Sequence, residues 1–148
     1  MVIEYKRIDG PIFEKIAGMY GEWVRQYIII REDTFPLAAM DGDIPAGFVC
    51  VTPRALPYPL EHVKDAYIED LEVDENYRRR GIARHLITSA EIWAAKEGFR
   101  QIRTHHNDKA EAAIKLSESL NYGLCPWDYW IDGEKFSGYW VAKVLSAH

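Results

Sequence analysis

The sequence contains little cysteine and no long apolar run, and both shortages exclude classes of protein. Cys50 and Cys125 are the only two cysteines among the 148 residues, they lie far apart, and no CxxC pair occurs. This argues against a structural disulfide and fits a reduced intracellular compartment. No apolar run approaches the length that crosses a membrane, and residues 1–10 lack the pattern of a signal peptide. We therefore expect a cytoplasmic protein with no membrane partner.

Positive charge is also in short supply. Lys and Arg number 18 against 23 Asp and Glu, which gives a net charge of -5. A nucleic-acid-binding domain needs a basic face, so we expect no nucleic-acid partner. Net negative charge instead attracts cationic ligands from a distance. With 48% apolar and 28% charged residues, the composition is typical of one globular domain, and we expect residues 1–148 to form it.

Apolar periodicity and turn residues predict an α+β fold. Asp-Gly pairs at 41–42 and 132–133 predict hairpins, and three prolines in residues 52–63 predict a loop. The predicted strands are 2–8, 34–40, 44–51, 66–74, 99–105, 127–131 and 135–145. The predicted helices are 11–30, as one long or broken helix, 81–98 and 110–121. The expected order is therefore β-α-β-β-β-α-β-α-β-β.

Three arginines and a glycine at residues 78–81 stand where a predicted strand gives way to a helix. The first turn of a helix has unpaired N–H groups, which together with the helix dipole favour an anion. Gly81 has no Cβ to obstruct a phosphate, and Arg78, Arg79 and Arg80 add positive charge. Neither GK[ST] nor GxGxxG is present, so this is neither a P-loop nor a dinucleotide fingerprint. The stretch predicts a polyphosphate ligand.

Arg78-x-x-Gly81-x-Ala83 resembles the Q/R-x-x-G-x-G/A signature of the GNAT superfamily of acyl-CoA N-acyltransferases, and the resemblance extends over residues 66–122. It implies a mixed, mostly antiparallel central sheet flanked by helices, with acetyl-CoA as co-substrate and no metal. It also implies that the pantetheine arm of the cofactor lies where two strands splay apart. The cofactor-binding residues that it implies are Leu71, Val73, Arg78, Arg79, Arg80, Gly81, Ile82 and Ala83.

The stretch YIEDLEV, residues 67–73, also resembles polyamine and some aminoglycoside acetyltransferases, in which acidic residues of this strand face the acceptor. That resemblance implies direct transfer, in a ternary complex, to the primary amine of a small cation. Two alternatives stay open: acetylation of a protein N-terminus or lysine, and a non-catalytic acyl-CoA-binding module. A homodimer also stays open, since dimers are common in this superfamily.

Glu69, Asp70 and Glu72 are the candidates for the catalytic base. An alkylamine has a pKa of about 10.4 and must lose a proton before it attacks a thioester, and a nearby carboxylate can accept that proton. Strand alternation predicts Glu69 and Asp70 on opposite faces, so at most one of them should meet the acceptor. Tyr67 shares the predicted face of Glu69 and could help to enclose an ammonium group, which favours Glu69. His105 and His106, at the end of the next strand, are further candidates or simply polar strand-end residues.

Residues 113–117, Ala-Ile-Lys-Leu-Ser, resemble the family pattern Ala-Ile-x-Leu-Tyr, whose tyrosine commonly protonates the departing thiolate of coenzyme A. Ser117 takes the place of that tyrosine. It could hydrogen-bond the sulfur, or Tyr122 or Tyr129 could substitute for the missing acid. The thiolate could also leave unprotonated, because a thiol has a pKa of only about 8.5. Ser117 would then be a small residue at a helix–sheet contact.

Overall fold

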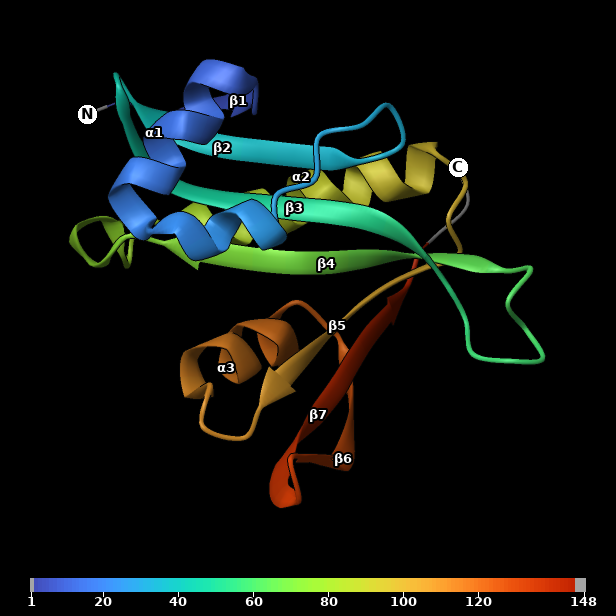
Figure 1. Ribbon diagram of the computed structural model, residues 1–148. Coiled ribbons are helices and arrows are strands. Elements are labelled where there is room, and N and C mark those ends of the chain that lie inside the picture. The colour runs from blue at the N-terminus through green and yellow to red at the C-terminus, as the bar shows by residue number, and fades with distance from the viewer. Residues whose placement is uncertain (1, 146–148) are drawn as a thin grey trace.

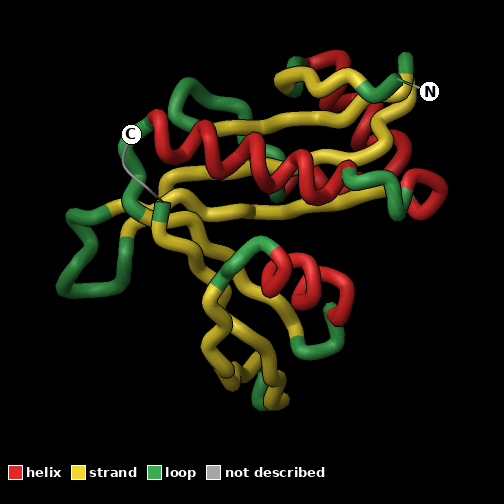
Figure 2. Tube along the Cα trace, turned by 180° about the vertical axis from the view of Figure 1, so that it is seen from behind, coloured by secondary structure: helices red, strands yellow, loops and turns green. Residues whose placement is uncertain are grey.

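The computed structural model describes residues 2–145 and arranges them around one seven-stranded sheet with the strand order β1-β2-β3-β4-β5-β7-β6. Helix α1 and the short helix η1 lie on one face of this sheet, and α2 and α3 lie on the other (Figures 1 and 2). The order of the elements confirms the predicted α+β fold. The elements are β1 Glu4–Arg7, α1 Gly10–Tyr20, η1 Glu22–Gln26, β2 Phe35–Asp41, β3 Ile44–Ala55, β4 Lys64–Val73, η2 Glu75–Tyr77, α2 Ile82–Lys96, β5 Gln101–Asn107, α3 Glu111–Ser119, β6 Gly123–Ile131 and β7 Glu134–Val144.

Strands β4 and β5 are the one parallel pair among the described strands, and they pair over a short distance. The ladder contains only the pairs Ala66–Ile102 and Tyr67–Arg103. Beyond it, β4 stays paired with β3 as far as Val73, while β5 stays paired with β7 as far as Asn107. The two strands therefore diverge, and Figure 1 shows β5 leaving the line of β4. This splay in the middle of the sheet is the one that the resemblance implied.

A buried carboxylate ties β4 to β5 at the closed end of the splay. Asp65 is 2% exposed and accepts hydrogen bonds from Gln101 Nε2 at 2.6 Å and from Arg103 Nε at 3.0 Å. One residue beyond the ladder, the hydroxyl of Thr104 donates to the carbonyl oxygen of Ile68 at 3.1 Å. Buried charge is tolerated only when it is paired and hydrogen-bonded, and Asp65 satisfies both conditions.

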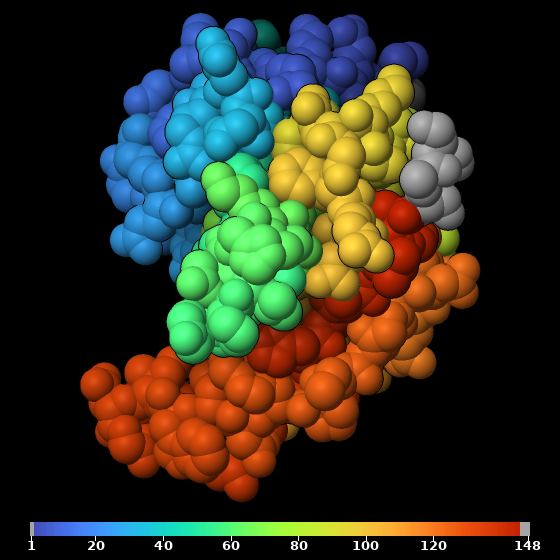
Figure 3. All heavy atoms as spheres, turned by 90° about the vertical axis from the view of Figure 1, so that its right-hand side faces the viewer, coloured from blue at the N-terminus to red at the C-terminus, as the bar shows by residue number. Residues whose placement is uncertain are grey.

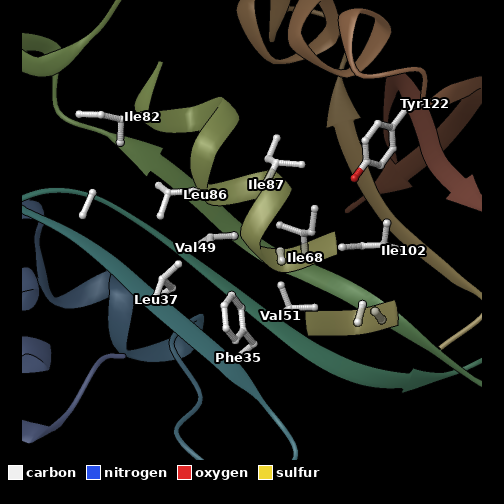
Figure 4. Close-up of a cluster of buried hydrophobic side chains, with 14 of the residues drawn as sticks. Phe35, Leu37, Val49, Val51, Ile68, Ile82, Leu86, Ile87, Ile102 and Tyr122 are labelled. Carbon is white, nitrogen blue, oxygen red and sulfur yellow. The ribbon is translucent and has the colours of Figure 1, made fainter. Parts of the chain in front are cut away.

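Each face of the sheet has its own apolar core. On one face, α2 buries Leu86 and neighbouring apolar residues against Val49, Val51 and Ile102 (Figure 4). The buried residues of α2 recur every three to four positions, which is the helical spacing that its sequence predicted. On the other face, Ile16 of α1 packs in a second cluster with Phe48 of β3. Two cores fix the central strands from both sides, so the splay is held in a rigid frame.

Several predicted boundaries differ from those of the structure, and β6 begins at Gly123 rather than at 127. The long or broken helix expected from 11 to 30 is broken: α1 ends at Tyr20, because its C-cap Gly21 has a φ of 125° outside the helical region, and the 3-10 helix η1 follows. Strand β3 runs through Pro53 to Ala55, so the predicted loop covers 56–63 rather than 52–63. Strand β2 begins at Phe35, opposite Val51, which leaves that edge of β3 unpaired at Pro53. A proline is tolerated at such an edge because no ladder hydrogen bond is lost there.

Replacing Asp65 by alanine should destabilise the protein by about 3–5 kcal/mol, because it leaves the largely buried guanidinium of Arg103 without its partner. Thermal unfolding followed by circular dichroism would measure the loss. Asp43→Ala is the control, since it breaks an ion pair with Lys15 in which the Asp43 side chain is 94% exposed. An Asp65→Ala protein that melts together with the control would show that the closed end does not depend on this carboxylate.

Candidate active site

A cavity of about 270 Å³ opens where β4 and β5 diverge. A second hollow shares Leu71, Glu72, Ala110 and Ala113 with it and continues to Arg78 at the start of α2. Together they form a channel from the arginine-rich turn to the middle of the sheet. The cavity is lined by Ile68, Glu69, Asp70, Leu71, Glu72, Ile87, Thr104, His105, His106, Asn107, Ala110, Ala113, Ser117 and Tyr122.

Gly81 stands in the chain between Arg78 and Ala83, which line the outer end of this channel. It is the N-cap of α2 and has a left-handed conformation, with φ 77° and ψ 10°, which a residue with a Cβ adopts only at a cost. No side chain caps the helix, so the N–H groups of its first turn remain available. A Cβ built on Gly81 would meet no atom of the described residues within 4 Å. The space beside this helix end is therefore open to an anionic group.

The other seven predicted cofactor residues differ in their exposure and in their position relative to the channel. Arg78, Arg79 and Arg80 are exposed, and Arg80 lies over the ring of Tyr77 at 5.4 Å. Ile82 is 2% exposed and packs in the core, so only its backbone can face a ligand. The remaining three residues, Ala83, Leu71 and Val73, line the channel. Four of the eight predicted residues, Leu71, Val73, Arg78 and Ala83, thus line the channel, whereas Arg80 lines a separate hollow beside Tyr77.

Glu69 is a β-bulge, an extra residue of β4 with no partner in β3. The neighbouring pairs of the ladder are Cys50–Asp70 and Val51–Ile68. A bulge interrupts the alternation of side chains between the two faces of a strand. It therefore removes the basis on which Glu69 and Asp70 were predicted to point to opposite faces.

Both carboxylates lie on the face of the sheet that α1 covers, which we call the α1 face. Asp70 is opposite Cys50, and Cys50 shares its face of β3 with Phe48 of the α1 core. Glu69 accepts a hydrogen bond of 2.8 Å from Thr52, which also shares that face of β3. The prediction of opposite faces is thus wrong, because the sequence carries no sign of the bulge.

The two carboxylates differ in their partners. Glu69 accepts hydrogen bonds from Thr52 and from two nitrogens of Arg54, at 3.2 and 3.0 Å, so both of its oxygens are engaged. Asp70 has one oxygen, Oδ2, that is buried and lacks a hydrogen-bond partner among the described residues. Burial, together with the nearby charge of Glu72, raises the pKa of Asp70 to about 7. A group with this pKa can accept a proton at neutral pH, so the geometry favours Asp70 as the base.

Comparison with known proteins identifies the family. The sequence model of the Acetyltransferase (GNAT) family matches residues 3–122. The chain belongs to this family. It is 32% identical over 119 residues to GCN5-related N-acetyltransferase 4, chloroplastic, of Arabidopsis thaliana, an alignment that covers 72% of this chain and 41% of that protein. The chain thus spans about two fifths of the length of this relative.

Solved structures of other N-acetyltransferases share the fold. Arabidopsis thaliana NAA60 in complex with a bisubstrate analogue superposes with a TM-score of 0.77 at 22% identity, covering 99% of this chain and 100% of that one. The ribosomal-protein-S18-alanine N-acetyltransferase of Escherichia coli gives 0.72 at 15% identity, covering 99% and 96%. NAA60 is also known in complex with acetyl-CoA. These likenesses confirm the GNAT fold that the sequence predicted.

In this GNAT domain the two histidines of β5 face opposite sides of the sheet. His105 lies on the α1 face, edge-on to the rings of Trp127, Tyr129 and Trp140 at 4.8 to 5.4 Å, and its Nε2 is buried without a hydrogen-bond partner among residues 2–145. His106 lies on the face covered by α2 and α3, where its Nε2 is 2.9 Å from the hydroxyl of Ser117. Burial lowers the pKa of both rings.

The His106–Ser117 contact escaped the sequence analysis because the two residues belong to different elements. The tyrosines proposed to replace the missing acid are placed less favourably. Tyr122 donates its hydroxyl to Glu91 at 2.7 Å, and burial raises the pKa of that hydroxyl. Tyr129 lies on the α1 face, opposite to Ser117, and accepts a hydrogen bond from Asn107. Ser117 is therefore the hydroxyl best placed on the α2/α3 side of the cavity.

Two further observations concern metal sites and membrane-spanning helices. No group of three or more His, Cys, Asp or Glu side chains that could hold a metal ion occurs within residues 2–145. No described helix has the length and apolar character needed to span a membrane.

Substituting Gly81 by valine should weaken coenzyme A binding at least tenfold, or about 1.4 kcal/mol by calorimetry, because the side chain would fill the space beside the helix end. Gly98→Val is a matched control. Gly98 also has a positive φ, of 89°, and a Cβ placed on it would likewise meet no described atom within 4 Å, but it lies just beyond the other end of α2. Both variants carry similar backbone strain, so equal affinities would rule out a phosphate site at Gly81.

Asp70→Asn should stabilise the protein above neutral pH. The folded-state pKa of Asp70, about 7, exceeds the value of about 3.9 for an unfolded aspartate. The folded state therefore binds more protons between these values, and stability falls as the pH rises through about 7. Asparagine mimics the protonated acid and removes this loss. The melting temperature of Asp70→Asn should exceed that of the wild type at alkaline pH and match it in strong acid, whereas Asp33→Asn, at an exposed site, should follow the wild type throughout.

Proposed function

We propose that this domain transfers an acetyl group from acetyl-CoA to a primary amine by direct attack in a ternary complex. The channel from Arg78 and Ala83 to Asp70 carries the proposal, because it leads from the start of α2, which no side chain caps among the described residues, to a carboxyl group whose pKa lies near 7. The pyrophosphate would bind at the start of α2. The pantetheine arm would follow the diverging edge of β4, with the thioester between β4 and β5.

Asp70 would accept the proton that the acceptor loses. The ammonium group would approach from the α1 face, where Asp70 and Glu72 are the carboxylates of β4 that no arginine pairs with among the described residues. Proton loss frees the nitrogen lone pair to attack the thioester carbonyl. A base whose pKa is near the working pH is unprotonated in a large fraction of the molecules, and it still binds a proton strongly enough to drive the transfer.

The charges on the α1 face bear on the choice of acceptor. The sequence led us to expect a small cationic amine, with Glu69 helping to attract it. Arg54 neutralises Glu69, and Arg103 neutralises Asp65, so the negative charge left near the splay suits a single ammonium group better than a polycation. This pairing favours a second candidate acceptor, the α-amine of a polypeptide.

The surroundings of the α1 face are compatible with such a chain end. The β6–β7 hairpin (orange to red) projects beyond the body of the molecule in Figure 3, and the loop at 56–63 (green) projects from that body in Figure 1. The hairpin carries Trp127 and Tyr129 on this face, beside His105. Solved structures with the same fold include the NatC complex bound to Gag peptide and CoA. Because these structures are at most 22% identical to this chain, the likeness shows the fold alone.

Thiol release from acetyl-CoA, measured with a panel of polyamines, simple monoamines and short peptides, tests the proposal. Release that depends on a primary amine is expected, and faster release with peptides than with polyamines would select the second candidate. Calorimetry with coenzyme A completes the test. Binding without release for any amine would instead identify a non-catalytic acyl-CoA-binding module.

Asp70→Asn should lower kcat/KM at neutral pH by about a hundredfold or more, since a general base typically contributes that much. The wild-type profile should rise through about pH 7, where Asp70 ionises, and the variant should lack this step. Coenzyme A affinity should not change. Glu69→Gln is the comparison: if it abolishes the step and Asp70→Asn preserves it, the base is Glu69.

A further inference from the structure

The hydrogen bond between His106 and Ser117 has no part in the steps described so far. His106 comes from the β5 arm of the splay and Ser117 from α3, and both line the cavity in which the thioester would lie. Their atoms Nε2 and Oγ are 2.9 Å apart, and Ser117 is only 4% exposed. The pair lies on the α2/α3 face, whereas Asp70 lies on the α1 face. Its position is therefore that of the leaving group rather than of the acceptor.

The hydroxyl hydrogen of Ser117 has no partner in its own helix. A serine within a helix often donates to a backbone carbonyl one turn earlier, and Ser119 does so to Leu116 at 2.7 Å. For Ser117, His106 is the side-chain partner found within residues 2–145. Burial lowers the pKa of His106, so its ring is neutral at pH 7 and carries one N–H. If that hydrogen is on Nε2, the ring donates to Ser117 and the hydroxyl hydrogen is free to point into the cavity.

We propose that the hydroxyl of Ser117 donates a hydrogen bond to the sulfur of coenzyme A, and that His106 fixes this orientation by donating from Nε2 to the same oxygen. The inference rests on the proposed function. Ser117 is then a catalytic residue, because it touches the leaving group. His106 is a positioning residue, because it acts through Ser117.

The chemical step balances without a proton from this pair. The ammonium group first loses one proton, through Asp70 to solvent. The free amine nitrogen then forms the new C–N bond and gives its second proton to Asp70. The C–S bond breaks, and the sulfur leaves with the bonding electrons as a thiolate. A hydrogen bond to an anion is stronger than one to a neutral thioester sulfur, so the Ser117 contact strengthens as the reaction proceeds and lowers the barrier.

The ionisation of enzyme-bound coenzyme A provides a direct test. Thiolate absorbs in the ultraviolet, so the absorbance of the complex can be titrated against pH. A hydrogen bond to the thiolate should lower the thiol pKa by about one pH unit in the wild type relative to Ser117→Ala. Acetyl transfer by Ser117→Ala should be about tenfold slower, by the same conversion. The titratable groups that also face the cavity are unchanged in this comparison, namely Glu69, Asp70, Glu72, His105, His106 and Tyr122.

Variants of His106 separate positioning from packing. His106→Gln keeps a side-chain N–H that can reach Ser117, and it should retain most of the thiol shift. His106→Leu fills similar space without a donor, and it should lose the shift. Ser119→Ala and His62→Ala, both at exposed positions, should behave as the wild type. Affinity for coenzyme A that lacks its sulfur should be the same in all of these proteins.

The experiments test the contact with sulfur, the proposed function and the positioning by His106 separately. A thiol pKa equal in the wild type and Ser117→Ala would overturn the contact with sulfur, while continued acetyl transfer would leave the proposed function intact. Absence of coenzyme A binding in the wild type would remove the proposed function itself, and the inference with it. If the His106 variants fail to fold, nitrogen-15 shifts of the wild-type ring decide its role. A proton on Nε2 is expected, and a ring protonated only on Nδ1 would overturn the positioning by His106.

Discussion

The ladder between β4 and β5 contains only two residue pairs, Ala66–Ile102 and Tyr67–Arg103, and the site depends on how short this ladder is. Both strands remain paired on their outer sides, so the gap beyond Tyr67 cannot close by local adjustment. The inner edges of both strands then present backbone groups that must be satisfied by a ligand or water. Asp65 stabilises this arrangement, because it ties the two strands together at the closed end of the ladder, on the side away from the gap.

The bulge at Glu69 determines the electrostatics of that gap. It brings Glu69 and Asp70 to one face, and Arg54 then neutralises the first but not the second. Asp70 is left half-buried beside Glu72, which is unfavourable for folding above neutral pH and useful for accepting a proton. The same local arrangement thus reduces stability and supports the proposed chemistry, a relation common at functional sites.

The sheet separates two tasks by face. The α1 face carries the carboxylates and the aromatic side chains beside His105, and it suits the acceptor. The α2/α3 face carries the start of α2 and the His106–Ser117 pair, and it suits the cofactor. Neighbouring residues of β5 can serve both tasks because successive side chains of a strand point in opposite directions.

Features that depend on neighbouring residues in the chain could be predicted from the sequence. These include the order of elements, the apolar face of α2, the hairpin turn at 132–133 and the glycine at the start of α2. The bulge, the Arg54–Glu69 ion pair and the His106–Ser117 contact could not, because each arises from the register between separate elements. Local patterns specify which strands and helices form. Only their packing decides which side chains share a face, and here it favours Asp70 over Glu69 as the proposed base.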